Sequence, residues 1–157
     1  MDEENEEALL PQQIGPYHTE SLLAKGKLSE VYLAVDPNTQ KPLVVKTLAE
    51  KCLSREDMVD RFFQEARIIA MSHHPSIVKL YGYGRWDKGV YIAMEFVRGM
   101  TLREFLLQQG MSLERALQVT LQIGYALTHL HAYGVIHGDL KPDNILLTAE
   151  GGIKVTD

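Results

Sequence analysis

Residues 135–147 read VIHGDLKPDNILL, and this stretch decides the fold of the chain. Apolar residues flank a polar centre that holds the carboxylate of Asp139, the ammonium of Lys141 and the amide of Asn144. A polar β-turn with a chance Asp and Asn is the alternative explanation. Such a turn accounts for neither the flanking apolar runs nor the spacing. A rigid loop with a carboxylate and, five residues on, an oxygen ligand suits proton transfer beside a divalent cation.

This stretch resembles the protein-kinase catalytic loop, H-R-D-L-x-x-x-N, with Gly138 in place of the arginine. The resemblance implies that Asp139 accepts the proton of the substrate hydroxyl and that Asn144 binds Mg²⁺. Lys141 would neutralise the γ-phosphate as charge develops. Without the arginine, phosphorylation of an activation loop is less needed, as in "non-RD" enzymes.

Two further segments stand in the order of the protein-kinase family. Residues 153–157, IKVTD, resemble the strand that leads into D-F-G, and Asp157, 13 positions after Asn144, is the expected second metal ligand. Lys46 ends the apolar run LVV and resembles the V-A-I-K lysine that holds the α- and β-phosphates. Because a lysine at the end of a buried strand needs a partner, we expect an ion pair with Glu65 on the next helix.

The glycine-rich loop is weak, because residues 24–31, AKGKLSEV, keep only the middle glycine of G-x-G-x-x-G-x-V. An ordinary hairpin explains this stretch equally well. Residues 91–99, YIAMEFVRG, resemble the edge strand and hinge, with Met94 as gatekeeper. The resemblance implies that Val31, Val44 and Leu146 sandwich adenine, although all three would also serve as plain core residues. The full set of implied nucleotide-binding residues is Ala24, Gly26, Ser29, Val31, Val44, Lys46, Met94, Glu95 (backbone), Val97 (backbone) and Leu146.

The apolar patterns predict an α+β fold, with five strands and an inserted helix, then two helices and a hairpin. One face of the long helix is expected to carry Leu113, Leu117, Thr120, Ile123, Leu127 and Leu130. By resemblance the fold is the bilobal protein-kinase fold. Its expected parts are a disordered acidic tail at 1–14, a β-rich N-lobe with one helix at 15–94, a hinge at 95–99 and part of a helical C-lobe at 100–157.

Composition limits the partners and the compartment. A formal net charge of −5 argues against a nucleic-acid surface. No apolar run approaches the ~18 residues that span a bilayer. The single cysteine, Cys52, fits a reducing compartment, so we expect a cytoplasmic protein.

The resemblance implies a bacterial-like, ATP- and Mg²⁺-dependent (or Mn²⁺-dependent) kinase that phosphorylates Ser and Thr of protein substrates. Lys141-Pro142 favours Ser/Thr over Tyr specificity. We expect residues 1–157 to be a truncated N-terminal fragment with little activity alone. Three alternatives stay open: a non-catalytic ATP-binding or scaffolding module, a remnant that does not fold, and, from His-Gly-Asp-Leu, an aminoglycoside- or choline-type phosphotransferase.

Overall fold

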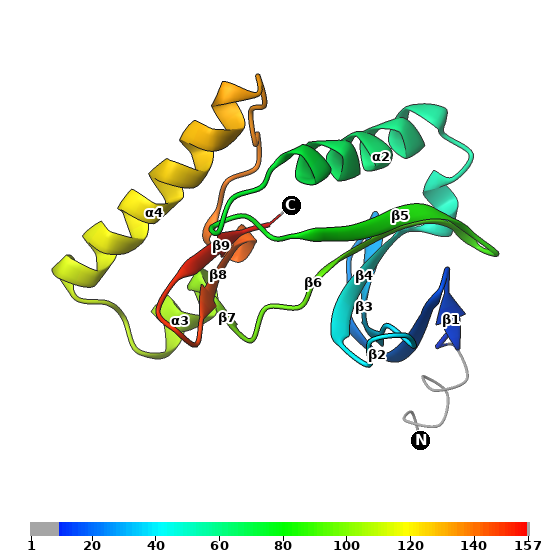
Figure 1. Cartoon of the computed structure of the whole chain (residues 1–157), viewed down its shortest axis with the longest axis horizontal. Coiled ribbons are helices and arrows are strands. Elements are labelled where there is room, and N and C mark those ends of the chain that lie inside the picture. Colours follow the sequence, from blue (N-terminus) through cyan, green and yellow to red (C-terminus); the bar gives the residue numbers. More distant parts are fainter. Residues whose placement is uncertain (1–9, 157) are drawn as a thin grey trace. The chain divides into compact units, whose positions relative to one another are not determined.

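The computed structural model describes residues 10–156. The chain forms two compact units. Unit 1 takes the described part of Met1–Ala66 together with Leu80–Phe96, and unit 2 takes Arg67–Lys79 and the described part of Val97–Asp157. Figure 1 labels the elements of both units.

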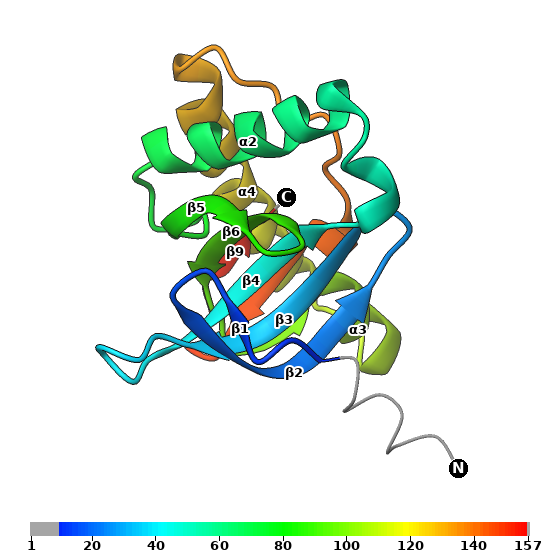
Figure 2. The same ribbon diagram turned by 90° about the vertical axis from the view of Figure 1, so that its right-hand side faces the viewer.

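Unit 1 is an antiparallel sheet of six strands in the order β1-β2-β3-β4-β6-β5. Figure 2 shows β2, β3 and β4 side by side. Its elements are β1 (Gln13–Ile14), β2 (Tyr17–Lys25), β3 (Ser29–Val35), β4 (Pro42–Leu48), β5 (Leu80–Trp86), β6 (Gly89–Glu95), the 3-10 turn η1 (Glu50–Cys52) and helix α2 (Glu56–Met71), whose last residues belong to unit 2.

One face of this sheet carries the core of unit 1. Tyr32, Val45 and Ala93 form one cross-strand row on β3, β4 and β6, and all three are buried. The burial follows the two-residue period of the strands. The residues that alternate with this row point to the opposite face of the sheet.

The ordered part of the chain begins earlier than the predicted boundary at residue 15. Ile14 is fully buried, and β1 pairs with β2. Gly15 (φ +57°) carries the chain past the ring of Tyr91, where a Cβ would lie only 2.6 Å from the ring carbons. Ile14 of this lead-in thus joins the core, and Leu10 packs against it. The predicted disorder of residues 1–9 lies outside the described residues.

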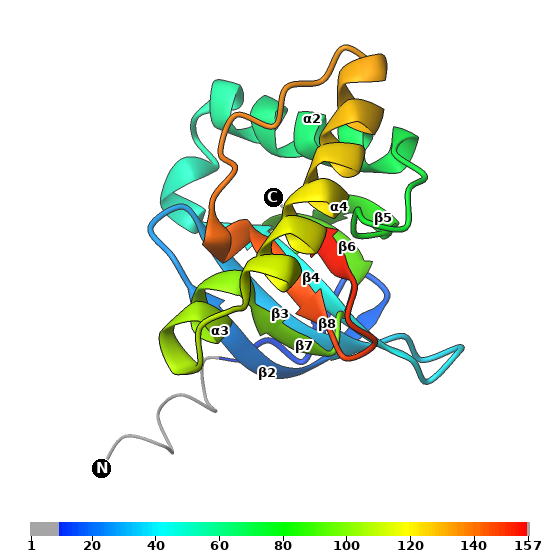
Figure 3. The same cartoon turned by 90° about the vertical axis from the view of Figure 1, so that its left-hand side faces the viewer.

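Unit 2 combines three short strands with two helices (Figure 3). Thr101 and Glu104 form the predicted capping box at the start of the first helix. The core gathers side chains of the second helix, such as Val119, and of the hairpin, such as Ile145. The elements are β7 (Gly99–Thr101), α3 (Leu102–Gln108), α4 (Leu113–Ala132), η2 (Pro142–Asn144), β8 (Ile145–Thr148) and β9 (Ile153–Val155).

The predicted apolar face of α4 is uncovered in its first turns and buried at its end. Leu113 is 77% exposed and Leu117 62% exposed, whereas Leu130 is 5% exposed. The apolar residues of α4 form two stripes, and only the stripe with Val119 and Ala126 packs into the core. The second stripe continues through Leu121 and Tyr125 and faces outward.

The start of β7 admits only glycine. Gly99 has φ +152°, and a Cβ there would lie 1.8 Å from the carbonyl oxygen of Leu147. Gly99 pairs with Thr148 of β8, so the two backbones meet directly.

None of the helices between residues 10 and 156 has the length and apolar character of a membrane span.

Candidate active site

Strand register brings the candidate residues of unit 1 onto one face of the sheet. Ala24 pairs with Val31, Val31 with Lys46, and Val44 with Met94. Directly opposed residues of antiparallel strands point to the same face. The five side chains lie on the face opposite the Tyr32 core row, because Val31 and Tyr32 are consecutive.

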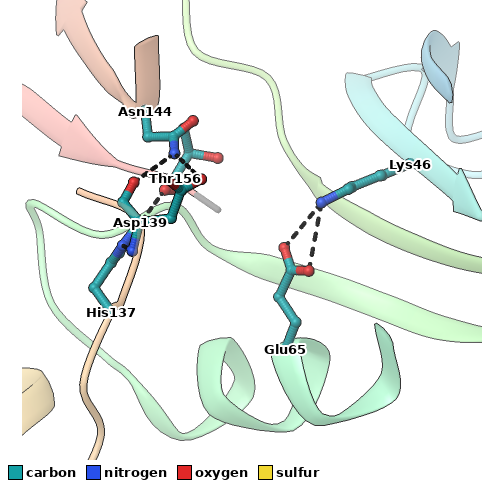
Figure 4. Close-up of polar contacts among 6 residues, drawn as sticks. All are labelled: Lys46, Glu65, His137, Asp139, Asn144 and Thr156. Atoms are coloured by element: carbon teal, nitrogen blue, oxygen red, sulfur yellow. Dashed lines mark hydrogen bonds and ion pairs between the residues drawn. The ribbon is translucent and has the colours of Figure 1, made fainter. Parts of the chain in front are cut away.

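The predicted ion pair forms on this face. Lys46 Nζ lies 3.2 Å from Glu65 Oε1 and 3.4 Å from Oε2 (Figure 4). The side chains are 14% and 26% exposed. Partial burial makes each charge depend on a partner, because desolvation disfavours an isolated ion. Glu65 therefore fixes the ammonium group at the end of a rigid strand.

The hairpin between β2 and β3 keeps its shape with a single glycine. Gly26 N–H donates to the carbonyl oxygen of Ser29 at 2.8 Å. Gly26 lies outside the left-handed region, and a Cβ there would lie 3.4 Å from Ser29 O. The fold of the hairpin does not itself demand glycine at position 26. Ala24 and Gly26 are exposed, and Ser29 is half-buried.

The remaining predicted nucleotide contacts divide between the units. Glu95 ends β6 opposite Leu43 in unit 1. Val97 and Leu146 belong to unit 2, where Leu146 pairs with Thr101 and Lys154. All three predicted residues are half-buried.

Asn144 is the centre of the loop in unit 2. Its side chain is buried, and Nδ2 donates to the backbone oxygen of Asp139 at 2.8 Å and to Oδ2 of Asp139 at 3.3 Å. Its backbone N–H donates to Lys141 O, and its carbonyl accepts from Thr156 N–H, both at 2.9 Å. Asn144 thus ties together the catalytic-loop residues and the strand end at residue 156.

The donor set around Asn144 fits a hard cation. Because Nδ2 makes the hydrogen bonds to Asp139, the amide oxygen is the atom that remains for a metal, and oxygen is the ligand Mg²⁺ prefers. In Figure 4 this oxygen points away from Asp139. Between residues 10 and 156 no cluster of three His, Cys, Asp or Glu side chains is placed to hold a metal. Asp157, the other predicted ligand, lies outside the described residues.

The carboxylate of Asp139 is open to a substrate. Its side chain is 63% exposed, and Lys141 Nζ lies 3.3 Å from Oδ2. The Lys141 side chain is 49% exposed, so the pair contributes little to stability. The loop thus presents an acceptor for a proton and a mobile positive charge side by side.

His137, to which the sequence analysis assigns no role, supports the loop through both of its ring nitrogens. Its Nδ1 accepts a hydrogen bond from Asp139 N–H at 3.1 Å, so Nε2 carries the proton and donates to Thr156 O at 2.9 Å. The ring therefore links the loop to the residue before Asp157 (Figure 4). In the sequence, only the position of His137 at the start of the motif points to this role. The contact with Thr156 cannot be read from the sequence, because the two residues are 19 positions apart.

Gly138 gives the loop its turn between His137 and Asp139. Its φ is +80°, in the left-handed region, and a Cβ would meet nothing closer than Ile136 O at 4.0 Å. Space is thus available at this position, but the backbone favours glycine.

A paired lysine on a strand and an Asp-Lys-Asn loop beside a strand end are each features that kinase-type phosphotransfer proteins carry. The chain belongs to the protein kinase domain family, whose model matches residues 17–157. The serine/threonine-protein kinase PknA of Mycobacterium tuberculosis is 38% identical over 149 residues, which cover 91% of this chain and 35% of that protein. PrkC of Bacillus subtilis is 36% identical over 144 residues, with 91% and 22% covered.

The crystal structure of the Mycobacterium tuberculosis PknI kinase domain matches with a TM-score of 0.82 and 24% identity. The match covers 94% of this chain and 61% of that one. These comparisons confirm the predicted protein-kinase fold and the bacterial-like family, and they favour protein kinases over the small-molecule phosphotransferases. The chain spans about a third of the length of PknA.

Proposed function

We propose that this protein transfers the γ-phosphate of ATP to serine and threonine hydroxyls of protein substrates. The observation that carries the proposal is the double hydrogen bond from Asn144 to Asp139, which holds a proton acceptor beside a free amide oxygen. The printed names of PknA and PrkC, both serine/threonine-protein kinases, support the choice of hydroxyl.

ATP would use the face of the unit 1 sheet opposite the core. Lys46, oriented by Glu65, holds the α- and β-phosphates. The hairpin with Ala24, Gly26 and Ser29 covers the phosphates. The adenine ring is assigned to Val31, Val44, Met94 and Leu146 and to the backbone of Glu95 and Val97. We accordingly propose residues 15–94 as the N-lobe, 95–99 as the hinge and 100–157 as part of the C-lobe.

Asp139 accepts the hydroxyl proton while the substrate oxygen bonds to the γ-phosphorus. The bond from that phosphorus to the β–γ bridging oxygen breaks, and ADP leaves with the electron pair. Lys141 neutralises charge on the transferred group. His137 holds the backbone of Asp139 in place throughout.

Asn144 and Asp157 would hold Mg²⁺, or Mn²⁺ in its place. A bound ion of this kind would neutralise negative charge on the phosphates. Asn144 keeps its amide oxygen available because its amide nitrogen is hydrogen-bonded to Asp139.

We place the protein in the cytoplasm, since Cys52 is a buried free thiol.

A second candidate is a module that binds ATP without transferring phosphate. The specific observation in its favour is the loop with one glycine, since two of the three family glycines are Ala24 and Ser29. Binding and transfer separate the two candidates.

The test measures transfer of labelled γ-phosphate from ATP to a Ser/Thr protein substrate by the full-length protein. Asp139→Asn is expected to lower the rate at least about 10²-fold, because the proton acceptor is lost. Asp143→Asn makes the same chemical change on the same loop, at a residue whose ion pair with Arg103 is exposed, and should change the rate less than about threefold. Equal activity of Asp139→Asn and the unmodified protein would contradict the proposal. ATP binding without any transfer would support the second candidate.

A further inference from the structure

The hairpin proposed to cover the phosphates stands largely in solvent. Ser21 to Lys25 on β2 are all exposed, and so is Leu28 at the tip. With so little packing, the shape of the hairpin depends on contacts between its own two strands.

Glu30 makes two contacts, one with each carboxylate oxygen: the contact with Lys25 crosses to β2, and the contact with Tyr32 lies along β3 itself. Lys25 is its direct cross-strand partner, and Lys25 Nζ lies 3.7 Å from Oε1. Tyr32, two residues along the same strand, donates its hydroxyl hydrogen to Oε2. The carboxylate therefore links β2, the loop end of β3 and a core tyrosine. We call this group of three side chains the Glu30 clasp.

The tyrosine is the firm end of the clasp. Tyr32 is 6% exposed and packs in the unit 1 core with Val45 and Ala93. Burial and the hydrogen bond to Glu30 both raise the pKa of Tyr32, so the phenol stays protonated and donates. The Lys25 side chain is 69% exposed and its ion pair adds much less.

The clasp lies on the sheet face opposite the proposed nucleotide face. Glu30 and Tyr32 alternate with Val31, and Lys25 faces Glu30 just as Ala24 faces Val31. Glu30 therefore does not reach a nucleotide bound beside Val31 and Lys46. Its influence passes through the backbone of Ser29 and Val31, its neighbours in the chain.

We propose that Glu30 is a positioning residue for the nucleotide phosphates, which anchors the hairpin to the Tyr32 core and holds it preorganised. This inference rests on the proposed function. A loop with three glycines has more conformational freedom to lose on binding than this loop, in which Ala24 and Ser29 take two of those positions. Less conformational entropy is then lost when Mg-ATP binds.

Simple electrostatics predicts the opposite effect of removing Glu30. A carboxylate on the phosphate-covering hairpin repels the triphosphate, so its removal alone would tighten the binding of Mg-ATP. If the clasp positions the loop, removal weakens that binding instead. Whether removal of Glu30 weakens or tightens Mg-ATP binding therefore decides between positioning and simple electrostatic repulsion.

The experiment measures dissociation constants for Mg-ATP and for adenosine by calorimetry on the full-length protein. Glu30→Ala and Tyr32→Phe should each weaken Mg-ATP binding about tenfold and leave adenosine within about twofold, because the tip of the hairpin, from Ala24 to Ser29, is proposed to contact the phosphates and not the adenosine. Glu30→Gln keeps an acceptor for the Tyr32 hydroxyl and should restore most of the affinity. The double variant should bind Mg-ATP no more weakly than Glu30→Ala, because Glu30→Ala already removes the hydrogen bond that Tyr32→Phe removes.

Glu20→Ala is the matched control for Glu30→Ala, at an exposed glutamate on the neighbouring strand β2, and should change neither constant. Unchanged or tighter Mg-ATP binding by Glu30→Ala would overturn the inference, as would an equal loss for adenosine. If the unmodified protein does not bind Mg-ATP, the proposed function fails and the inference fails with it. Binding by the unmodified protein together with no effect in Glu30→Ala would sink the inference alone.

Discussion

The candidate residues of unit 1 and those of unit 2 are held by different kinds of support. In unit 1, Val31, Lys46 and Ile92 form one row that backbone ladder bonds hold in register, whatever the side chains are. In unit 2, Asp139 stands on a loop whose backbone is bonded to the side chains of His137 and Asn144. A substitution in unit 1 should thus remove one group and leave the frame, whereas a substitution in unit 2 should move its neighbours as well.

The largest effect is expected for Asn144→Ala. This change removes the proposed metal ligand and both hydrogen bonds to Asp139, so phosphate transfer should fall at least about 10²-fold. Steady-state kinetics with a protein substrate measures the loss. Asn38→Ala, on an exposed turn of unit 1, should leave the rate unchanged. A loss under about threefold for Asn144→Ala would show that the loop holds its shape without this side chain.

A smaller effect is expected for Glu65→Gln on the sheet side. Lys46 keeps its position on the strand but loses the charged partner that orients its ammonium group, so affinity for Mg-ATP should fall about tenfold. Titration of a fluorescent nucleotide analogue measures this constant. Asp60→Asn changes an exposed acid of the same helix and serves as the control. If circular dichroism showed that Glu65→Gln also melts the sheet, the contrast between the two halves would break down.

The two glycines sharpen the comparison at the level of the backbone. Gly138→Ala forces a side chain into the left-handed region and should lower the free energy of unfolding by about 1 kcal/mol. Gly26→Ala adopts an ordinary φ and should change it by less than about 0.5 kcal/mol. Urea denaturation followed by circular dichroism measures both. Equal losses at the two positions would mean that the hairpin of unit 1 is as strained as the loop of unit 2.

The smallest effect concerns a histidine of unit 2 away from the loop. Burial, with a further contribution from the charge of His129, lowers the pKa of His74 from its ordinary value of 6.5. The folded state then binds a proton less tightly than the unfolded chain, so stability present above pH 6.5 is lost as the pH falls.

Asn at position 74 can still accept from Ser76 N–H, which now bonds to His74 Nδ1 at 3.0 Å. His74→Asn should therefore reduce the fall in melting temperature between pH 7 and pH 5. Thermal melts at both values measure it, and His18→Asn, at an exposed residue of unit 1, is the control. An unchanged fall in His74→Asn would assign the acid sensitivity to other groups.

The difference between strand pairing in unit 1 and side-chain contacts in unit 2 also explains which features the sequence predicts well. Strands β3, β4 and β6 contain short runs of apolar residues, many of them β-branched or aromatic, so the strands are predictable from the sequence. The Lys46–Glu65 pair followed from the cost of burying a lone charge. Strands β1 and β7, of two and three residues, are too short to show any period and were missed.

The support of the loop could not be predicted, because it depends on contacts between distant residues. Nothing in the spacing of His137 and Thr156 indicates that they meet. Which stripe of α4 packs into the core is hard to predict for a related reason. Leu113 and Leu117 follow a helical period as well as Val119 and Ala126 do, and only the tertiary structure shows which stripe is covered.

The absence of a side chain at position 99 has a practical consequence for protein engineering. The connecting residues Phe96, Val97 and Arg98 lie between β6 and β7, outside both sheets. Immediately afterwards, position 99 leaves 1.8 Å between a Cβ and a carbonyl oxygen. A saturation library across residues 96–99 should therefore yield many functional sequences at its first three codons and glycine alone at the fourth.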